Sequence, residues 1–267
     1  MKFPNIDPTA FEIFGVGIKW YGISYALGLL LALWYAKKIA KKSAAVEVKV
    51  LDDVLIWTAF GIIIGGRLGY VIFYDLVYYL QNFHLIIIGI RNGGMSFHGG
   101  LIGVIIFSFL YSKIKKIKFL TLMDIISCVA PIGLFLGRIA NFINSELWGK
   151  ETNLVIGIVF PNGGPNPRHP TQIYEAFLEG LILFFIINII YNKKCNTPGY
   201  TSCIFLILYG FFRIFAEIFR EPDPHIGYIM QPFLTLGILL SIPMILLGLI
   251  ILYYLNEQNR TNTKTKY

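Results

Sequence analysis

Long apolar blocks constrain this chain more than any other feature of its sequence. About seven of them approach the roughly 20 residues that a helix needs to cross the hydrocarbon core of a bilayer. They predict an all-α polytopic membrane protein with about seven transmembrane helices. The third and fourth blocks are short, so we expect them to tilt or to be broken. The blocks cover residues 17–36, 51–74, 96–112, 119–137, 172–191, 199–219 and 231–255.

The composition agrees with a membrane-embedded chain. Of the 267 residues, 56% are hydrophobic and only 14% are charged, and the mean hydropathy is +0.65, which is outside the usual soluble range. We expect one integral-membrane domain over residues 1–255 and a polar cytoplasmic tail over residues 256–267. The start, MKFPNIDPTA, lacks the basic region and apolar core of a secretory signal, so the first block should be retained.

Lysine clusters predict how the blocks cross the membrane. The net charge is +8, and basic residues gather after alternate blocks, in KKIAKK, KIKKIK, NKK and NRTNTKTK. If every block crosses, all four clusters lie on one side, which the positive-inside rule makes cytoplasmic. The prediction is an amino terminus outside, a carboxyl terminus in the cytoplasm and small extracytoplasmic segments. Because topology accounts for the basic charge, we exclude a nucleic-acid partner.

The cysteines and short motifs predict neither a disulfide framework nor a cofactor. Cys128 lies in an apolar block, whereas Cys195 and Cys203 lie at or near the expected cytoplasmic face. No CxxC or HExxH spacing, P-loop or internal repeat is present. The familiar signatures of a metal or nucleotide site are therefore missing.

The connections expected outside the cytoplasm hold the chemically distinctive residues. These connections cover residues 75–95, 138–171 and 220–230. They contain or adjoin the stretches NGGMSFHGGLIG, GRIANFINSELWG, PRHPTQIYE and YGFFRIFAEIFREPD. The cytoplasmic connections are short and rich in lysine, so we look for the site on the outer face.

The last of these stretches carries a polar stripe along an expected helix. At 100° per residue, Tyr209, Arg213, Arg220 and Glu217 fall at about 0°, 40°, 20° and 80°. Arg213 and Glu217 are spaced i, i+4, so one interpretation is a salt bridge that eases burial of a charge. The second arginine on the stripe favours an anion site. An arginine at mid-bilayer costs about 2.5–3.5 kcal/mol, which makes such residues functional candidates.

Arg138 raises the same question on another helix. It lies away from a face of small residues that permits close helix packing, so it can point into a cavity. An interfacial arginine that reaches the headgroups is the simpler alternative. That role does not need the amides and carboxylate that follow, Asn141, Asn144 and Glu146. The small face consists of Gly133, Gly137, Ala140 and Asn144.

The stretch FGIIIGGRLGY predicts helix packing through its repeated glycines, Gly61, Gly65 and Gly69. Arg67, in the same stretch, has two open interpretations. It is either a further inward-facing cation or a structural residue paired with Asp75 or a headgroup.

Two histidines and a tyrosine complete the candidates. His98 lies at the expected outer mouth of a block, between glycine pairs that permit close backbone approach, and we favour a catalytic or substrate-contact role over a structural one. His169 precedes Pro170, which can simply begin the next helix. Tyr21 belongs with the aromatic residues of the membrane interface, but it also lies where it can reach an outer cavity.

These residues predict a cavity that opens to the outer leaflet. The planar fork of arginine suits phosphate oxygens, and apolar helices suit acyl chains. The residues alone therefore predict a protein that binds or processes lipid phosphate. A lipid transporter and a noncatalytic scaffold are the alternatives. A transporter should show repeats or broken helices open to both faces, whereas the polar motifs here lie on one face.

The stretch GRIANFINSELWG resembles the signature of the prolipoprotein diacylglyceryl transferase family, G-R-x-[GA]-N-F-x-N-x-E-x-x-G. Every fixed position of that signature is present. HGGLIGV, HPTQIYE, the early WYG and YGFFRIFAEIFREPD are similar to other blocks of the family, in the same order. The resemblance extends from about residue 3 to about residue 255.

The resemblance implies an enzyme of the bacterial cytoplasmic (inner) membrane with its active site on the extracytoplasmic side. It implies transfer of the sn-1,2-diacylglyceryl group from phosphatidylglycerol to the lipobox cysteine of a preprolipoprotein, with a thioether formed and glycerol phosphate released. This is the first step of bacterial lipoprotein maturation. It needs no metal or nucleotide cofactor, because the phospholipid is an activated donor. The family's site residues map onto Tyr21, His98, Arg138, Asn141, Glu146, Gly149, Arg213 and Glu217.

Four residues are expected to carry the chemistry that the resemblance implies. Arg138 and Arg213 are the candidates to bind the phosphate and stabilise its departure. A thiol needs a base or a nearby cation to become a thiolate, and His98 is the candidate base unless it orients the lipid instead. Glu217 is expected to position Arg213.

The remaining candidates are expected to bind substrate. Asn141 and Glu146 would fix either Arg138 or the glycerol headgroup. Tyr209 and Arg220 share the polar stripe with the catalytic candidates and would line the same cavity. For every candidate residue, the prediction therefore covers both its place in the cavity and its chemical role.

Overall fold

The long helices of the computed structural model correspond to the apolar blocks, and two short helices, Leu76–Gln81 and His84–Ile88, lie in the connection expected over residues 75–95. Residues 1–4, 6–43, 46–89, 94–222, 227–230 and 234–264 are described. Six of the described helices are long and apolar enough to cross a membrane, and a shorter apolar helix joins them, which confirms an all-α polytopic membrane protein. The side on which each terminus lies stays a prediction. In chain order the helices are α1 (Trp20–Ser43), α2 (Val50–Tyr74), α3 (Leu76–Gln81), α4 (His84–Ile88), α5 (Phe97–Ile114), α6 (Phe119–Ile143), α7 (Thr171–Glu175), the π-helical turn η2 (Ala176–Ile182), α8 (Leu183–Lys194), α9 (Tyr200–Phe219) and α10 (Leu236–Lys264).

Two helices at the ends of the chain differ in extent from the blocks that predict them. α1 starts after residue 17 and continues through the lysine cluster KKIAKK to Ser43, because lysine is a good helix former whose long side chain reaches water. α10 starts at Leu236 and continues as a helix to Lys264. The first residues of the last block, 231–233, lie outside the described residues.

α6 extends well beyond its expected end at residue 137. It continues to Ile143, so Arg138 and Asn141 lie on its last two turns rather than in the connection after it. Apolar residues, Ile139, Ala140, Phe142 and Ile143, continue through this segment, and it contains no proline or glycine that would end the helix earlier. The signature stretch therefore starts on a rigid element.

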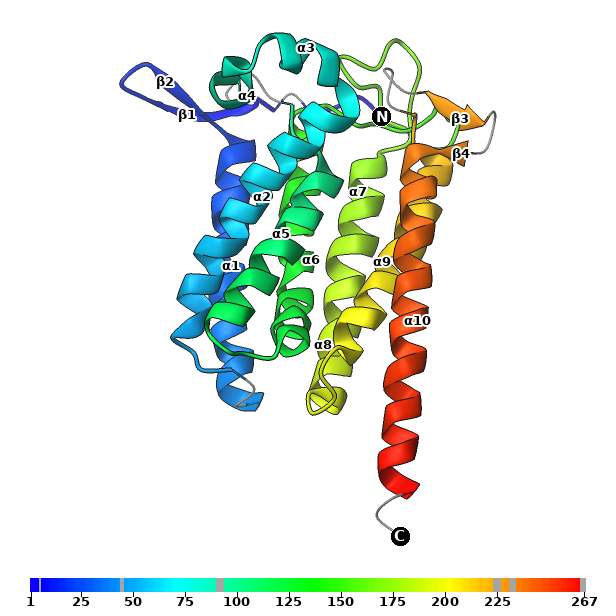
Figure 1. The fold of residues 1–267 in the computed structure, drawn as a ribbon. Coiled ribbons are helices and arrows are strands. Elements are labelled where there is room, and N and C mark those ends of the chain that lie inside the picture. Colours follow the sequence, from blue (N-terminus) through cyan, green and yellow to red (C-terminus); the bar gives the residue numbers. More distant parts are fainter. Residues whose placement is uncertain (5, 44–45, 90–93, 223–226, 231–233, 265–267) are drawn as a thin grey trace. The chain divides into compact units, whose positions relative to one another are not determined.

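Two short β-hairpins, which the apolar pattern does not predict, precede membrane helices (Figure 1). In the first, the turn puts Phe14 and Gly15 at positive φ, 50° and 78°, a conformation that glycine adopts freely. Each hairpin leads directly into a helix, α1 or α10. The strands are β1 (Thr9–Ile13) with β2 (Val16–Lys19) and β3 (Tyr228–Met230) with β4 (Leu234–Thr235), both pairs antiparallel.

The chain forms two compact units. One consists of Met1–Tyr35 and Ile126–Tyr267, and the other of Ala36–Ile125. α1 and α6 contribute residues to both. The single membrane domain over residues 1–255 stays a prediction.

In the unit Ala36–Ile125, α2 and α5 approach each other through glycines. A Cβ atom added to Gly61 would lie 2.7 Å from the backbone oxygen of Gly103, and one added to Gly69 would lie 2.6 Å from the Cα atom of Gly99. One added to Gly65 would overlap the Gly99 oxygen. The packing role predicted for this glycine repeat is therefore confirmed.

Arg67, in the same unit, is buried and binds backbone oxygens. Its Nε donates to Ile86 O at 2.8 Å, its Nη2 to Leu85 O at 2.7 Å and its Nη1 to Gly94 O at 3.1 Å. These bonds tie the segment that contains α4 to α2. They support the structural interpretation of Arg67.

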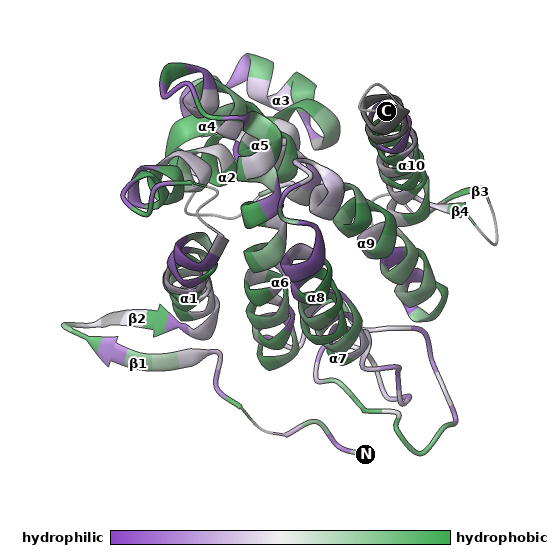
Figure 2. Ribbon diagram, turned by 90° about the horizontal axis from the view of Figure 1, so that it is seen from below, coloured by the Kyte–Doolittle hydropathy of each residue, from purple (hydrophilic) through white to green (hydrophobic). Residues whose placement is uncertain are grey.

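In the other unit, α7, η2 and α8 form one continuous membrane span. Gly180 of η2 packs against Phe135 of α6, because a Cβ atom on the glycine would lie 2.6 Å from the Phe135 Cβ atom. Gly210 of α9 packs in the same way against Ile245 of α10, at 2.5 Å from its Cγ1 atom. Figure 2 shows mostly apolar helix ribbons. A π-helical turn inside a helix often marks a functional site.

Candidate active site

The signature stretch, residues 137–149, begins on α6 and continues as a tight turn. Ser145 and Leu147 adopt positive φ, 54° and 58°, which residues with a Cβ atom take only where surrounding contacts hold them. Within the stretch, Asn141 Nδ2 donates to Glu146 Oε1 at 2.7 Å. The turn thus brings the Glu146 carboxylate back to the end of α6.

Two buried side chains tie this turn to the start of α7. Thr171 Oγ1 donates to Leu147 O at 3.0 Å, and Gln172 Nε2 donates to Glu146 O at 2.5 Å. Thr171 and Gln172 have no exposed surface. They belong to HPTQIYE, so two stretches that are distant in sequence form one structural element.

Gly149 lies where three backbone segments meet. Its N–H donates to His169 O at 2.8 Å, and it forms a β-bridge with Arg220. A Cβ atom at Gly149 would overlap Phe219 O and would lie 2.7 Å from Thr171 Cγ2. Glycine is needed here for the close approach of these segments. A contact between Gly149 and substrate stays a prediction.

The polar stripe expected on α9 is formed. Arg213 Nη2 lies 2.9 Å from Glu217 Oε2, which is the salt bridge that the i, i+4 spacing predicts. Tyr209, one turn earlier, is buried, and its ring stacks on Phe205 with centroids 5.8 Å apart. Arg220 follows the helix directly with an extended backbone.

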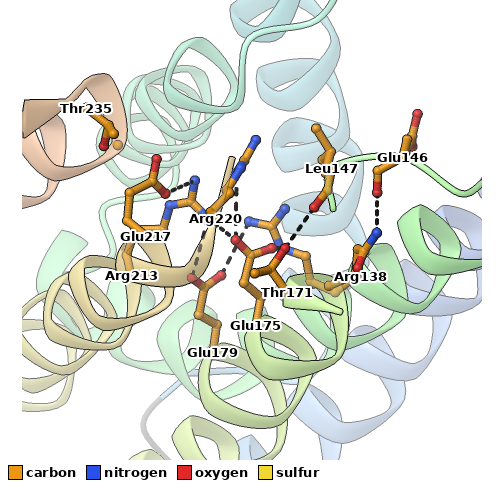
Figure 3. Close-up of polar contacts among 12 residues, drawn as sticks. Arg138, Glu146, Leu147, Thr171, Glu175, Glu179, Arg213, Glu217, Arg220 and Thr235 are labelled. Carbon is orange, nitrogen blue, oxygen red and sulfur yellow. Dashed lines mark hydrogen bonds and ion pairs between the residues drawn. The ribbon is translucent and has the colours of Figure 1, made fainter. Parts of the chain in front are cut away.

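Two buried glutamates that the sequence interpretation missed join the arginines (Figure 3). Glu175 ends α7 and Glu179 lies in η2. Arg138 Nε lies 3.0 Å from Glu175 Oε2, and Arg138 Nη2 lies 3.5 Å from Glu179 Oε2. Arg213 Nη1 makes a short ion pair with Glu175 Oε1 and lies 3.8 Å from Glu179 Oε1. Arg220 Nη1 lies 3.7 Å from Glu175 Oε1.

These ion pairs define an arginine–glutamate cluster. The guanidinium groups keep at most 14% of their side-chain surface exposed, and the two glutamates of α7 and η2 keep none. Charges held so far from water are stable only when paired, since removing one partner of a buried pair costs about 3–5 kcal/mol. The cluster consists of Arg138, Arg213, Arg220, Glu175, Glu179 and Glu217.

The missed glutamates have a signal in the sequence. Glu175 and Glu179 stand four residues apart inside the apolar block 172–191, and an ionisable residue within a membrane span is a functional candidate whose partner must be found. The sequence interpretation weighed His169 and Pro170 instead. Their neighbours in the same stretch carry the charge that balances the arginines.

The contacts of Arg138 correct one expectation. Among the described residues, Glu175 and Glu179 hold Arg138, whereas Asn141 and Glu146 bond to each other. Support of the guanidinium therefore comes from α7 and η2 and not from the signature turn. The headgroup role of Asn141 and Glu146 stays a prediction.

Glu217 also lies against the first turn of α10. A Cβ atom added to Gly237 would lie 2.7 Å from Glu217 Cδ. Thr235 caps the helix, since its Oγ1 accepts from Ile238 N at 3.3 Å. The first turn of α10 thus packs directly against the Glu217 carboxylate.

Tyr21 and His98, the remaining candidates, belong to different compact units. Tyr21 is on the first turn of α1, and its hydroxyl lies 3.3 Å from that of Tyr25. His98 is the second residue of α5 and is half-buried. Ser96 caps that helix, because its Oγ accepts from Gly99 N at 3.2 Å. The roles of Tyr21 and His98 stay predictions.

His169 lies just before α7 and makes more than a capping contact. Its Nδ1 lies 3.1 Å from the Tyr174 hydroxyl, and its ring packs on Phe219 with centroids 5.2 Å apart. Burial, and then the nearby Lys150 ammonium, lower the pKa of His169 below its ordinary value. His169 is therefore part of the packing beside Gly149.

The cluster offers the chemistry of oriented guanidinium groups. Their N–H donors suit an anionic oxygen such as that of a phosphate. Within the described residues, no group of three His, Cys, Asp or Glu side chains could hold a metal ion. No disulfide joins the three cysteines, Cys128, Cys195 and Cys203, all of which lie in the described part of the chain.

Comparison with known proteins places the chain in a family. The family model described as prolipoprotein diacylglyceryl transferase matches residues 8–254. The chain belongs to the prolipoprotein diacylglyceryl transferase family. It is 43% identical over 273 residues to the phosphatidylglycerol--prolipoprotein diacylglyceryl transferase of Brucella anthropi, which covers 99% of this chain and 96% of the relative. It is 44% identical over 271 residues to the proteins of the same name from Brucella canis and Brucella ovis, with 98% of this chain and 96% of each relative covered.

The arginine–glutamate cluster unites three of the stretches that resemble the prolipoprotein diacylglyceryl transferase family. Arg138 comes from GRIANFINSELWG and Glu175 from HPTQIYE, while Arg213 and Glu217 come from YGFFRIFAEIFREPD. Glu179 alone lies outside these stretches, four residues after Glu175. Three motifs of this family member therefore converge on one set of buried charges.

Proposed function

We propose that the protein transfers the sn-1,2-diacylglyceryl group of phosphatidylglycerol to the lipobox cysteine of a preprolipoprotein. The observation that carries the proposal is 43% identity, over nearly the full length, to a protein that bears the name of this activity. The arginine–glutamate cluster adds a buried cationic site suited to a phosphate. The reaction is the first step of bacterial lipoprotein maturation.

The protein acts in the bacterial cytoplasmic membrane, with its site open to the extracytoplasmic side. The support is the sequence pattern, in which the lysine clusters and the polar motifs fall at opposite ends of the apolar blocks. A lipid donor reaches such a site from the outer leaflet. The peptide acceptor arrives with its own membrane segment.

The transfer is a substitution at a glycerol carbon of the lipid. The sulfur attacks that carbon, a C–S bond forms and the C–O bond to the phosphate breaks. The electron pair of the broken bond leaves with glycerol phosphate, so negative charge grows on the phosphate oxygens. Arg138 and Arg213 supply N–H donors to that charge, in a site where little water weakens the interaction. Glu175 holds both guanidinium groups and orients them before the lipid arrives.

The thiol must lose its proton for the sulfur to attack. We assign the base role to His98, because histidine titrates near neutral pH. The alternative is that His98 orients the lipid. Full activity of a His98→Gln variant between about pH 6 and 8 excludes the base role.

The residues of the signature turn form the headgroup side of the site. We assign Asn141 and Glu146 to the glycerol hydroxyls, since their side chains bond to each other and retain further hydrogen-bonding capacity. Tyr21, Tyr209 and Arg220 complete the substrate-binding set. Gly149 contributes by letting the backbone segments of the site approach closely.

Mass spectrometry of a lipobox peptide tests the proposed function. After incubation with the purified protein and phosphatidylglycerol, the peptide should carry a diacylglyceryl group on its cysteine. A matched peptide with serine in place of that cysteine should stay unmodified. A lipid transporter or a scaffold would leave both peptides unchanged, and that result rejects the proposal.

A further inference from the structure

The arginine–glutamate cluster is electrically balanced before any ligand arrives. Its ion pairs join three arginines to three glutamates, all largely withdrawn from water. A phosphatidylglycerol molecule brings one more negative charge on its phosphodiester. An uncompensated charge in such surroundings is strongly unfavourable. Binding of the lipid therefore requires either a positive charge from outside or the loss of a negative one.

We propose that Glu179 takes up one proton when the donor phospholipid binds, and gives up its arginine contacts to the phosphate. The inference rests on the proposed function only in taking an anionic phospholipid as the ligand. It adds a role for a glutamate that lies outside the stretches resembling the family. A proton on Glu179 restores the balance of the cluster.

Distances single out Glu179 among the three carboxylates. Its two ion pairs, with Arg138 and Arg213, measure 3.5 and 3.8 Å. Glu175 lies 3.0 Å from Arg138 Nε and makes a still shorter contact with Arg213, and Glu217 lies 2.9 Å from Arg213. Within the described part of the chain, one oxygen of each of these three carboxylates accepts no hydrogen bond, so the ion-pair distances are what distinguish Glu179. Its negative charge is therefore the most weakly held.

The groups around Glu179 explain why its charge depends on the arginines. Arg138 faces it from α6, and Arg213 and the Tyr209 hydroxyl face it from α9. Glu175, one turn earlier, is a like charge that disfavours ionisation. The first eight residues of α8, LFFIINII, carry no titratable side chain, and its Tyr191, Lys193 and Lys194 lie at the other end of the helix from Glu179.

The consequence follows from what the phosphate displaces. When phosphate oxygens occupy the N–H groups of Arg138 and Arg213, Glu179 keeps its burial and its acidic neighbour but loses the cations that held it charged. Protonation then becomes the favourable outcome. Glu175 differs because a third arginine, Arg220, also reaches it.

Calorimetry on the intact protein in detergent tests this proposal. Short-chain phosphatidylglycerol is titrated into the protein in two buffers that differ in their enthalpy of ionisation. We expect uptake of about one proton per lipid, and a lipid affinity that falls about tenfold per pH unit where Glu179 is charged in the free protein. A neutral diacylglycerol should bind without proton uptake. Binding of phosphatidylglycerol without proton uptake between about pH 5.5 and 8.5 overturns the proposal.

Two matched variants identify the glutamate. Glu179→Gln should bind phosphatidylglycerol with no proton uptake and with an affinity that does not change with pH. Glu175→Gln should bind more weakly at every pH, because Arg138 and Arg213 lose the carboxylate that orients them. The reverse pattern assigns the proton to Glu175 and refutes the role of Glu179. Glu151→Gln, a surface control, should keep the wild-type uptake.

The calorimetry and the transfer assay test the two proposals independently. Wild-type protein that takes up a proton with the lipid but modifies no peptide contradicts the proposed function and leaves the role of Glu179 standing. Protein that modifies the peptide but binds the lipid without a proton contradicts only the role of Glu179. If Glu179→Gln does not fold, the wild-type calorimetry still decides.

Discussion

Arg213 depends on its shape as well as on its charge. Its Nη1 meets Glu175 while its Nη2 meets Glu217, so one planar group serves carboxylates on two different helices. The single ammonium group of lysine cannot hold both directions at once. The same fork leaves its remaining N–H donors in a fixed direction for a phosphate.

We therefore expect Arg213→Lys to insert normally and to lower the rate of transfer by about 10²-fold or more, the effect of losing one oriented donor. The measurement is kcat with phosphatidylglycerol and a lipobox peptide. Lys115→Arg is the control, because Lys115 and its partner Asp53 are both about half exposed and exposed pairs contribute little. Equal turnover of wild type and Arg213→Lys would show that charge alone suffices.

Truncation of either central arginine should also abolish transfer. Arg138→Ala and Arg213→Ala each leave the buried Glu175 short of a partner, so we expect these variants to insert but to lose about 3–5 kcal/mol of stability. Thermal unfolding in detergent and transfer, measured on the same samples, separate the two effects. Wild-type turnover by both variants would refute the anion-binding role of these arginines.

Gly149 is expected to tolerate no side chain. Gly149→Ala forces a Cβ atom against Phe219 O and Thr171 Cγ2, which should cost about 1–3 kcal/mol as overpacking and displace the signature turn. Gly133→Ala is the matched control, since a Cβ atom there meets no described atom within 4 Å. The melting temperature should fall for the first variant and hold or rise for the second. A similar melting temperature for both would contradict the packing role.

His169 should make the stability of the protein depend on pH. Its pKa is lowered in the folded state by burial and by Lys150, so the unfolded chain binds the proton more readily. The stabilisation is complete above the unfolded value of about 6.5 and is lost as the pH falls through the lower, folded value. The difference in melting temperature between wild type and His169→Gln should therefore shrink from pH 7.5 to pH 5. A difference that does not change with pH would show that the imidazole is not linked to folding.

At the scale of elements, the contact of α2 with α5 is the most sensitive to added volume. Gly65→Ala places a methyl group on Gly99 O, and the backbone of a helix cannot give way as a flexible side chain can. We expect a loss of about 1–3 kcal/mol or more in unfolding experiments. Gly100→Ala, whose Cβ atom would lie an ordinary 3.6 Å from Ile62 O, should have little effect. Equal effects would mean that α2 and α5 do not pack through these glycines.

The sequence predicts the helices well because length and apolarity decide them. The β-hairpins escape prediction, since their strands are short and their register depends on local turns such as Phe14–Gly15. The end of α6 at Ile143 is also not predicted. A polar residue near the end of a membrane helix has the same sequence signature whether it lies in the last helical turn or in the connection after it. Tertiary contacts with α7 settle that boundary.

Some contacts of the candidate site can likewise be predicted from the sequence, and others cannot. Helical spacing is enough to predict the salt bridge between Arg213 and Glu217, which lie on one helix. It does not predict that Arg138 is held by Glu175 and Glu179, because that pairing depends on how α6 and α7 face each other. A charged residue within an apolar block shows that a partner is needed, but not which one.

At the scale of the whole molecule, the cysteine thiols test the orientation of the chain in the membrane. Cys128 and Cys203 are buried, whereas Cys195 is half-exposed beside the cluster NKK. A membrane-impermeant maleimide should label only Cys195, and only after the cytoplasmic face is opened. Cys195→Ala should abolish the labelling. Labelling of intact cells would reverse the predicted orientation.

The arginine–glutamate cluster also has a consequence for the order in which its charges are synthesised. The ribosome delivers Arg138 first, Glu179 follows 41 residues later, and Arg213 follows Glu175 by 38 residues. Arg138 is therefore synthesised before both glutamates that pair with it, whereas Glu175 and Glu179 follow a partner that is already present. During synthesis, α6 carries an unpaired arginine until α7 and η2 follow it. A chain cut short between α6 and α7 keeps Arg138 but lacks the two carboxylates that pair with it, and an unpaired arginine within a bilayer is costly.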